Sequence, residues 1–142
     1  MQAALDEARR AASAGEVPVG AALFRDGAVV ARAHNESVAR ADPTAHAELV
    51  AVQRALRALQ TDRLTDCTLY VTLEPCAQCA GTIVLAKVRK LVFGAYDPKA
   101  GMAGSVDDLL RHPRLNHRVE VVGGVDAEAC GDLLQAFFRE QR

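Results

Sequence analysis

Apolar residues recur along this chain with the period of a helix in some segments and the period of a strand in others. Residues 1–14 place Ala and Leu at helical spacing, and Gly15 stands where a helix would end in the left-handed region. Residues 19–34, VGAALFRDGAVVARAH, indicate two strands joined at Asp26-Gly27, a strong local hairpin signal. The first part of the chain therefore predicts a helix followed by a β-hairpin.

The rest of the chain continues as strands and helices, without a long linker, a low-complexity segment or an internal repeat. Asp42-Pro43-Thr44 holds residue types that cap a helix or occupy its first position, which predicts a helix from there to about Leu59. Pro75 is expected to open a helix that carries CAQCAGTIVLAKV. The other expected strands are 68–73, 90–95 and 118–124, and the other expected helices are a short one at 105–112 and a terminal one at 126–142.

This order of elements favours an α/β fold, namely a three-layer α/β/α sandwich around a mixed sheet of about five strands. The hairpin would supply an antiparallel pair, and the later strand-helix-strand crossovers would supply parallel pairs. With 142 residues, the chain is long enough to bury a core and too short for two ordinary domains. We therefore expect a single domain over residues 1–142.

Composition and charge narrow the classes of function. The formal net charge is −1, so the molecule as a whole does not attract nucleic acid, and such a partner would need a local basic face. Aromatic residues make up 4% of the chain and Trp is missing, so base stacking would rest on few rings. No apolar run approaches the ~20 residues of a membrane span, and no signal peptide is recognisable. We expect a soluble cytoplasmic protein without a membrane partner.

Four cysteines in a chain without a signal peptide favour metal binding over disulfides. Cys76 and Cys79 are three residues apart at an expected helix start, so their thiolates would project on one face near the positive end of the helix dipole. With His46 as the third ligand, the set would leave the fourth tetrahedral position of zinc for water, as in catalytic sites. Cys67 and Cys130 have no partner at ligand spacing and are expected to be small buried residues.

The C-x-x-C spacing by itself has other interpretations. A redox pair and half of a structural zinc site have the same spacing. A redox pair would not need an upstream His and Glu, and a structural zinc site would need a fourth Cys or His. The catalytic zinc hypothesis therefore depends on His46 as much as on the two cysteines.

Glu48 follows His46 by two residues inside an apolar run, TAHAELVAVQ (44–53). Residues two apart on a regular helix point in nearly opposite directions, so spacing alone does not bring the two side chains together. They converge only if His46 lies at the irregular start of the helix. Glu48 is therefore either an ordinary first-turn carboxylate, favourable with the helix dipole, or part of a reaction centre.

The residues at 46–48, His-Ala-Glu, followed by Pro-Cys-Ala-Gln-Cys at 75–79, resemble the zinc-dependent cytidine/deoxycytidylate deaminase superfamily, whose base-deaminating members share this H-x-E…P-C-x-x-C signature. The likeness extends over nearly the whole chain, which is similar to the bacterial tRNA-specific adenosine deaminases. The segments that carry it are EVPVGA (16–21), Asn35, DPTAHAE (42–48), TLYVTLEPC (68–76), CAG (79–81), VFGAYDPKAGMAGS (92–105), HPRLNHRVEV (112–121) and FFR (137–139).

The resemblance implies hydrolytic deamination of adenosine to inosine at the wobble position of a tRNA anticodon loop. One Zn²⁺ per subunit would be held by His46, Cys76 and Cys79 and would activate a water molecule as the nucleophile for carbon 6 of adenine. Glu48, which is not a ligand, would carry a proton from that water to the ring nitrogen and then to the leaving amino group.

The resemblance also implies residues for the target nucleoside. Asn35 would hydrogen-bond it, while Val19, Leu73 and the backbone near Ala47 would line the base pocket. Ordinary core packing remains an alternative for Val19 and Leu73, and a turn role remains an alternative for Asn35.

Contacts outside the base pocket follow from the same resemblance. Asp97 and Lys99 would belong to a substrate-contacting loop, with a solvated turn as the alternative. Phe138 would pack against the loop nucleotides, although neighbouring phenylalanines in a helix are more often core. The local basic surface is expected from Arg111, Arg114, His117, Arg118, Arg139 and Arg142.

A tRNA anticodon stem-loop is a physically sensible partner, because sequence-specific RNA recognition works mainly on unpaired loops, where extruding a base costs least. The resemblance further implies a homodimer. Two alternatives remain open. The first is a deaminase of a free base or nucleotide, of guanine or cytosine type, on the same zinc chemistry. The second is a zinc-stabilised RNA-binding module without activity.

Overall fold

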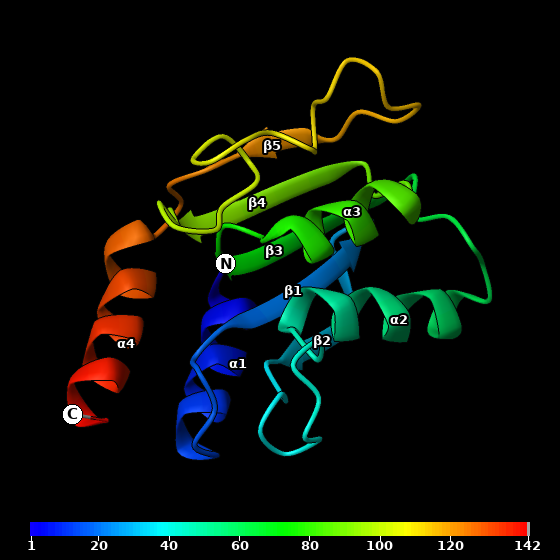
Figure 1. Cartoon of the computed structure of the whole chain (residues 1–142). Coiled ribbons are helices and arrows are strands. Elements are labelled where there is room, and N and C mark those ends of the chain that lie inside the picture. Colours follow the sequence, from blue (N-terminus) through cyan, green and yellow to red (C-terminus); the bar gives the residue numbers. More distant parts are fainter. Residues whose placement is uncertain (142) are drawn as a thin grey trace.

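Five strands form one mixed sheet in the order β2-β1-β3-β4-β5 (Figure 1). β1 is antiparallel to both β2 and β3, whereas the β3-β4 and β4-β5 pairs are parallel. The computed structural model describes residues 1–141. Within them the strands are β1 (Gly20–Arg25), β2 (Ala28–His34), β3 (Cys67–Leu73), β4 (Lys90–Ala95) and β5 (Glu120–Val122), and the helices are α1 (Gln2–Ser13), α2 (Ala47–Leu59), α3 (Ala77–Leu85) and α4 (Ala127–Glu140).

Helices cover both faces of this sheet, which confirms the three-layer sandwich. α1 and α4 contact each other, and they pack on β1–β2 and on β3–β4, respectively. α2 and α3 contact each other on the opposite face, where α2 packs on β1 and β2 (Figure 1). Buried aliphatic side chains of the sheet, α2 and α3 form one core, Leu134 of α4 packs against it, and β4 is buried on both faces. Within the described residues no helix is long and apolar enough to cross a membrane.

The local turn chemistry agrees with the sequence. Asp26 and Gly27 have φ values of 52° and 77°, and two consecutive positive φ angles are what a tight hairpin turn of the mirror-image type requires. Gly15 has a φ of 77° directly after α1, as expected for a helix C-terminus in the left-handed region. The hairpin and the first helix are therefore confirmed.

The prediction of a helix at 105–112 is wrong. This segment consists of turns and a single isolated bridge between Ala103 and Asp108. The Asp107 carboxylate accepts the Asp108 N–H and the Asp108 carboxylate accepts the Arg111 N–H, so these side chains satisfy backbone donors locally and compete with a helix. Leu110 is fully buried and anchors the segment to the core.

Three element boundaries also differ from the expected ones. α2 begins at Ala47 and not at Asp42, because Asp42 forms a turn in which its carboxylate accepts the N–H and hydroxyl of Thr44. α3 begins at Ala77, two residues after Pro75. The last strand is limited to Glu120–Val122. The first two shifts place His46 and Cys76 just outside their helices.

Candidate active site

The three expected metal ligands meet where α2 and α3 begin. His46 is the N-cap residue of α2 and Cys76 is the N-cap residue of α3, both with extended backbone, and Cys79 lies in the first turn of α3. The Sγ atoms of Cys76 and Cys79 each lie 3.5 Å from Nδ1 of His46, and all three ligand atoms lie within 4.8 Å of one another. Residues 30 or more positions apart in the sequence thus form one cluster because two helix N-termini converge.

The spacing of these atoms fits zinc. With Zn–S bonds of about 2.3 Å, Zn–N bonds of about 2.0 Å and tetrahedral angles, sulfur and nitrogen ligand atoms lie about 3.5 Å apart. The observed separation of 3.5 Å agrees with this value. Three protein ligands leave one tetrahedral position for water or substrate, which is the arrangement of catalytic zinc. The donor set of one imidazole and two thiolates is also one that zinc prefers.

In the absence of a cation, the pKa values of the two neighbouring thiols are shifted in opposite directions. Hydrogen bonds from the Cys79 thiol and from His46 lower the pKa of Cys76 well below its ordinary value. The neighbouring Cys76 thiolate, together with burial, raises the pKa of Cys79. A cation bound to both sulfurs would allow both thiols to lose their protons, because metal ligation deprotonates coordinating thiols.

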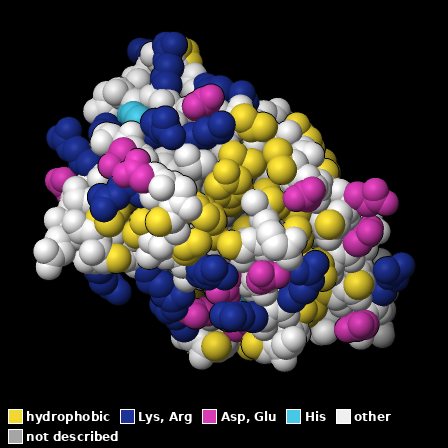
Figure 2. All heavy atoms as spheres, turned by 180° about the vertical axis from the view of Figure 1, so that it is seen from behind, with side chains coloured by type: hydrophobic (Ala, Val, Ile, Leu, Met, Phe, Trp, Pro, Cys, Tyr) yellow, Lys and Arg dark blue, Asp and Glu magenta, His cyan; other side chains and the backbone are white. Residues whose placement is uncertain are grey.

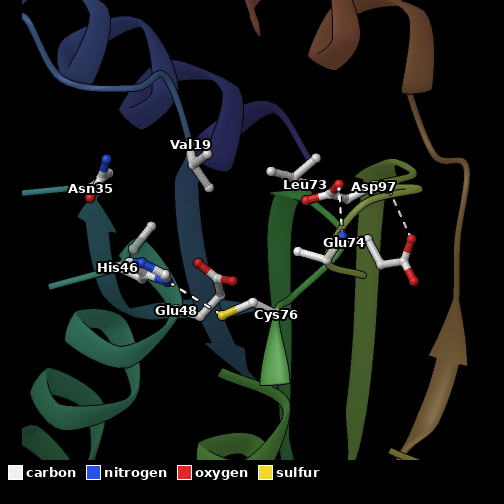
Figure 3. Close-up of a pocket in the computed structure, with 10 residues that line it drawn as sticks. Val19, Asn35, His46, Glu48, Leu73, Glu74, Cys76 and Asp97 are labelled. Atoms are coloured by element: carbon white, nitrogen blue, oxygen red, sulfur yellow. Dashed lines mark hydrogen bonds between the residues drawn. The ribbon is translucent and has the colours of Figure 1, made fainter. Parts of the chain in front are cut away.

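Glu48 lies in the first turn of α2, is 4% exposed, and lines the same cavity as His46. Burial raises the pKa of its carboxyl to about 7. His46 precedes the helix and has an extended backbone, with ψ near 152°, so the direction of its side chain is not set by the helical repeat. Figure 3 shows the His46 side chain beside Glu48 and Cys76. The sequence alone left open whether His46 and Glu48 converge, and the structure shows that they do.

A cavity of about 200 Å³ opens over these groups. This volume lies below the usual range of about 300–1,000 Å³ for sites that enclose a drug-sized ligand, so the cavity suits one flat base and leaves the rest of a nucleotide outside. The residues that line it are Val19, Asn35, His46, Ala47, Glu48, Leu73, Glu74, Cys76, Asp97 and Ala100. Five residues expected to contact substrate therefore surround the expected ligands and Glu48 (Figure 3).

Several of these residues also have the structural role that the sequence left open. The Asn35 side-chain oxygen accepts the Ser37 N–H at 3.2 Å, so Asn35 shapes a turn and lines the cavity. Val19 belongs to the buried core, and Leu73 packs against that core. Each of these three residues is therefore held in place by a core or turn contact and also lines the cavity.

Lys99 and Phe138 do not line this cavity. They line a shallower neighbouring cleft between the 96–99 loop and α4, which shares Leu73 and Asp97 with the cavity. The Phe138 side chain is 49% exposed and its ring stands edge-on to Phe137. Phe138 is therefore not a core residue, and it is exposed beside the opening of the base-sized cavity.

The expected basic surface is not one surface. The loop that holds Arg111 to Arg118 lies beyond β5, whereas Arg139 lies toward the opposite end of the molecule, near the end of α4 (Figure 1). Arg111 is also paired with Asp108 at 2.6 Å. On the face seen in Figure 2, Lys and Arg are interspersed with Asp and Glu. Arg139 instead lines a further cleft on α4, together with Lys99 and Phe138, and Arg142 lies outside the described residues.

Sequence reasoning missed Glu74, which also lines the cavity and is 2% exposed. Burial opposes its ionisation, but hydrogen bonds from the Ser105 hydroxyl and from the N–H groups of Asp97, Ser105 and Ala103 outweigh burial and lower its pKa. The signal available in the sequence was a charged residue between an apolar strand and Pro75. A charge at that place needs buried partners, and these come from a loop about 30 residues away.

Comparison with known proteins gives a consistent result. The profile of the MafB19-like deaminase family matches residues 1–142. The tRNA-specific adenosine deaminase of Bacillus subtilis (strain 168) is 51% identical, over 100% of this chain and 88% of that protein. That of Aquifex aeolicus (strain VF5) is 44% identical, over 100% of this chain and 93% of that protein.

Solved structures agree. One from studies of A-to-I editing by tRNA:A34 deaminases at the wobble position of transfer RNA has a TM-score of 0.91 and 42% identity, and the match covers 94% of this chain and 97% of that one. A guanine deaminase from Nitrosomonas europaea has a TM-score of 0.81 and 25% identity, covering 94% of this chain and 80% of that one. The fold and the site thus define an enzyme, and the chain belongs to the MafB19-like deaminase family. Within that family it belongs with the tRNA-specific adenosine deaminases.

Proposed function

We propose that this enzyme converts adenosine to inosine at the wobble position of a tRNA anticodon loop. The observation that carries the proposal is a cavity of the size of one base, lined by Glu48 and by the candidate zinc ligands His46 and Cys76. The similarity to tRNA-specific adenosine deaminases over the full chain supports adenosine in tRNA as the substrate.

The residues account for the chemistry as follows. Water replaces the exocyclic amino group at carbon 6 of adenine, giving inosine and ammonia. His46, Cys76 and Cys79 would hold Zn²⁺, which would lower the pKa of water so that it ionises near neutral pH. Glu48 accepts the proton that the water loses, places it on the ring nitrogen, and passes a proton to the departing amino group. In the protein without the cation, burial raises the pKa of this carboxyl to about 7, above its ordinary value, which favours a group that can take up and release a proton near neutral pH.

The cavity explains why an unpaired loop is required. It holds one base, so the target must leave the base stack, which costs least in a single-stranded loop. The Asn35 side chain lines the cavity where a nucleoside would be held. The adjoining cleft, lined by Phe138 and Lys99, and a further cleft on α4 that is lined by Phe138, Lys99 and Arg139, offer an aromatic face and two cations for the neighbouring nucleotides.

We also infer a homodimer that works in the cytoplasm. The resemblance to the tRNA-specific adenosine deaminases supports the dimer, and Leu85 on α3, 81% exposed, is a large apolar side chain available for a subunit contact. All four cysteines are free, as in a reducing compartment. Sedimentation of the wild type and of Leu85→Glu should give a dimer for the first and a larger monomer fraction for the second. A wild type that sediments as a monomer at all concentrations would refute the dimer.

The test of the function is a product analysis with zinc-loaded protein and a short anticodon stem-loop that bears adenosine at the wobble position of its unpaired loop. We expect inosine in the loop and ammonia in equal amounts, and a loss of at least about 10²–10⁴-fold in kcat for Glu48→Gln with zinc content unchanged. Free guanine and cytosine serve as competing substrates. Turnover of these bases with an unchanged stem-loop would overturn the proposal in favour of a free-base deaminase, and RNA binding without ammonia release would favour a binding module.

A further inference from the structure

Glu74 connects the metal-ligand segment to the loop that borders the cavity. It lies at the end of β3, two residues before Cys76, and its own N–H donates to the Ala95 carbonyl at 2.9 Å. Its carboxylate lies on the loop 97–105, which follows β4 and bears Asp97 and Ala100 at the cavity. Figure 3 shows this carboxylate turned toward the loop and away from His46 and Glu48.

Four donors of that loop satisfy the Glu74 carboxylate. Oε1 accepts the Asp97 N–H at 3.0 Å and the Ser105 hydroxyl. Oε2 accepts the Ala103 N–H at 3.0 Å and the Ser105 N–H at 3.1 Å. A buried carboxylate has about four lone-pair sites, so the loop fills its accepting capacity. Charge-assisted hydrogen bonds of this kind are roughly twice as strong as neutral ones.

The loop is built to close around this carboxylate. A Cβ at Gly101 would overlap with the carboxyl group of Glu74, so only glycine allows the backbone to approach so closely. Next to it, the Met102 N–H donates to the Pro75 carbonyl at 2.8 Å, which ties the loop a second time to the segment before Cys76. The loop therefore takes its position from Glu74 and Pro75 and not from its own turns alone.

Asp97 transmits this position to the cavity. Its N–H is held by Glu74, while its own carboxylate accepts the N–H groups of Lys99 and Ala100 at 3.0 and 3.2 Å. Both Asp97 and Ala100 line the cavity, and Asp97 and Lys99 line the adjoining cleft. A shift of the Asp97 backbone would thus move residues on both surfaces that face a nucleotide.

We propose that Glu74 is a positioning residue, whose buried carboxylate fixes the Asp97–Ser105 loop relative to the metal site so that Asp97 and Ala100 meet the bound nucleotide in a preset place. The role rests on the proposed function, since the nucleotide is the substrate named there. Glu74 does not contact the reacting atoms, so its effect is on substrate binding and not on proton transfer.

The donor pattern predicts the effect of the isosteric amide. In Glu74→Gln, one side-chain oxygen becomes an NH₂ group, which cannot accept a hydrogen bond. On the Oε2 side the NH₂ would face two backbone N–H groups, from Ala103 and Ser105. On the Oε1 side it would face only the Asp97 N–H, because the Ser105 hydroxyl can turn to accept. The amide therefore adopts the second orientation, and the hydrogen bond to Asp97 is the one that is lost.

The experiment compares zinc-loaded wild type, Glu74→Gln, Ser105→Ala and Glu7→Gln. Ser105→Ala keeps the Asp97 bond and removes the hydroxyl. Glu7→Gln is the matched control, because Glu7 is also a buried Glu, 5% exposed, but it pairs with Arg10 on α1. Each protein is measured for zinc content, for kcat and KM on the anticodon stem-loop, and for amide hydrogen exchange by NMR.

For Glu74→Gln we expect one zinc per chain, a KM raised about tenfold as for one lost hydrogen bond, and a kcat within about threefold of wild type. The Asp97 amide should exchange at least about tenfold faster, while that of Ala103 changes less. Ser105→Ala and Glu7→Gln should keep the wild-type KM within about twofold.

Three results would overturn the proposal: an unchanged KM together with unchanged Asp97 exchange, loss of zinc from Glu74→Gln, or a Ser105→Ala variant that raises KM as much as Glu74→Gln. Lack of wild-type turnover on the stem-loop would instead overturn the proposed function. In that case hydrogen exchange of Asp97, which needs no RNA, still decides whether Glu74 holds the loop.

Discussion

At the residue scale, the chemistry of Glu48 is set by where its carboxyl lies. The same side chain on a solvated first turn would keep an ordinary pKa, but at 4% exposure beside the metal ligands its pKa is raised to about 7. Glu74, with 2% exposure, responds in the opposite direction, because four donors outweigh burial and lower its pKa. Two buried carboxyls thus have pKa values shifted in opposite directions, which suits Glu48 to the proposed proton transfer and Glu74 to the proposed role of a fixed anion.

The raised pKa of Glu48 makes a prediction about stability. In zinc-free protein the folded-state pKa of about 7 lies above the reference value of 4.5, so between these pH values the folded chain keeps a proton that the unfolded chain has released. The free energy of unfolding should therefore fall as pH rises from 4.5 to 7, by up to about 3 kcal/mol from this group. Urea unfolding of zinc-free wild type and Glu48→Gln at pH 5 and pH 7 measures this contribution as the difference between the two proteins. Equal pH dependence in both would contradict the prediction.

At the element scale, helix N-termini and strand contacts decide the geometry. α2 and α3 begin after His46 and Cys76, so both ligands have extended backbone and lie close to the positive ends of two helix dipoles. On the other face, α4 approaches β4 closely at Gly94, where a Cβ would overlap with Cys130 and lie 2.8 Å from the Thr72 carbonyl oxygen. The buried Cys130 expected from the sequence is thus a packing residue of this contact.

The α4–β4 contact predicts opposite effects for two glycines. Gly94→Ala should destabilise the protein by about 1–3 kcal/mol, because the added methyl group overpacks the contact with Cys130 and Thr72. Gly131→Ala lies inside α4 with nothing within 4 Å of the added Cβ, so it should stabilise by about 0.5–1 kcal/mol. Thermal unfolding of both variants and of the wild type measures these two changes in stability. A Gly94→Ala protein as stable as wild type would show that β4 and α4 can separate without cost.

Elements that are stabilised by local contacts could be predicted from the sequence, whereas a segment that depends on contacts with distant residues could not. The hairpin at Asp26-Gly27 and the end of α1 at Gly15 rest on local backbone preferences, and both were predicted correctly. The segment 105–112 was predicted as a short helix, and this prediction is wrong. Its Asp107 and Asp108 side chains bond the local backbone instead, and a buried Leu110 fixes it to the core.

At the scale of the whole molecule, the site lies where layers meet. His46 and Cys76 come from the two helices of one layer, and Glu74 and Leu73 come from the end of β3 in the sheet. The parallel β3-β4 pair brings the loop after β4 beside the segment after β3, since the carboxyl ends of parallel strands share an edge. The His46, Cys76 and Cys79 cluster, the cavity and the adjoining cleft are therefore neighbours.

Because the metal site joins α2 to α3, zinc should stabilise the whole domain. Zinc at about 1,000 times its dissociation constant would add about 4 kcal/mol to the free energy of unfolding. Calorimetry with and without EDTA should show a higher Tm for the zinc-loaded wild type. Cys79→Ser, which removes a ligand 3.5 Å from His46 Nδ1, should lose most of this difference. A wild-type Tm that does not respond to chelation would contradict zinc binding at this cluster.

The sequence by itself determined the elements of local origin and the chemical inventory of the site. The HAE and PCAQC residues carry side chains of the types that bind zinc and transfer protons, and the alternation of strands and helices favoured an α/β sandwich. Only the tertiary structure decided that His46 and Glu48 face one cavity, that Arg139 lies apart from Arg111, and that Glu74 binds the 97–105 loop. These facts depend on contacts between residues far apart in the chain, and such contacts are fixed by packing, which local preference does not specify.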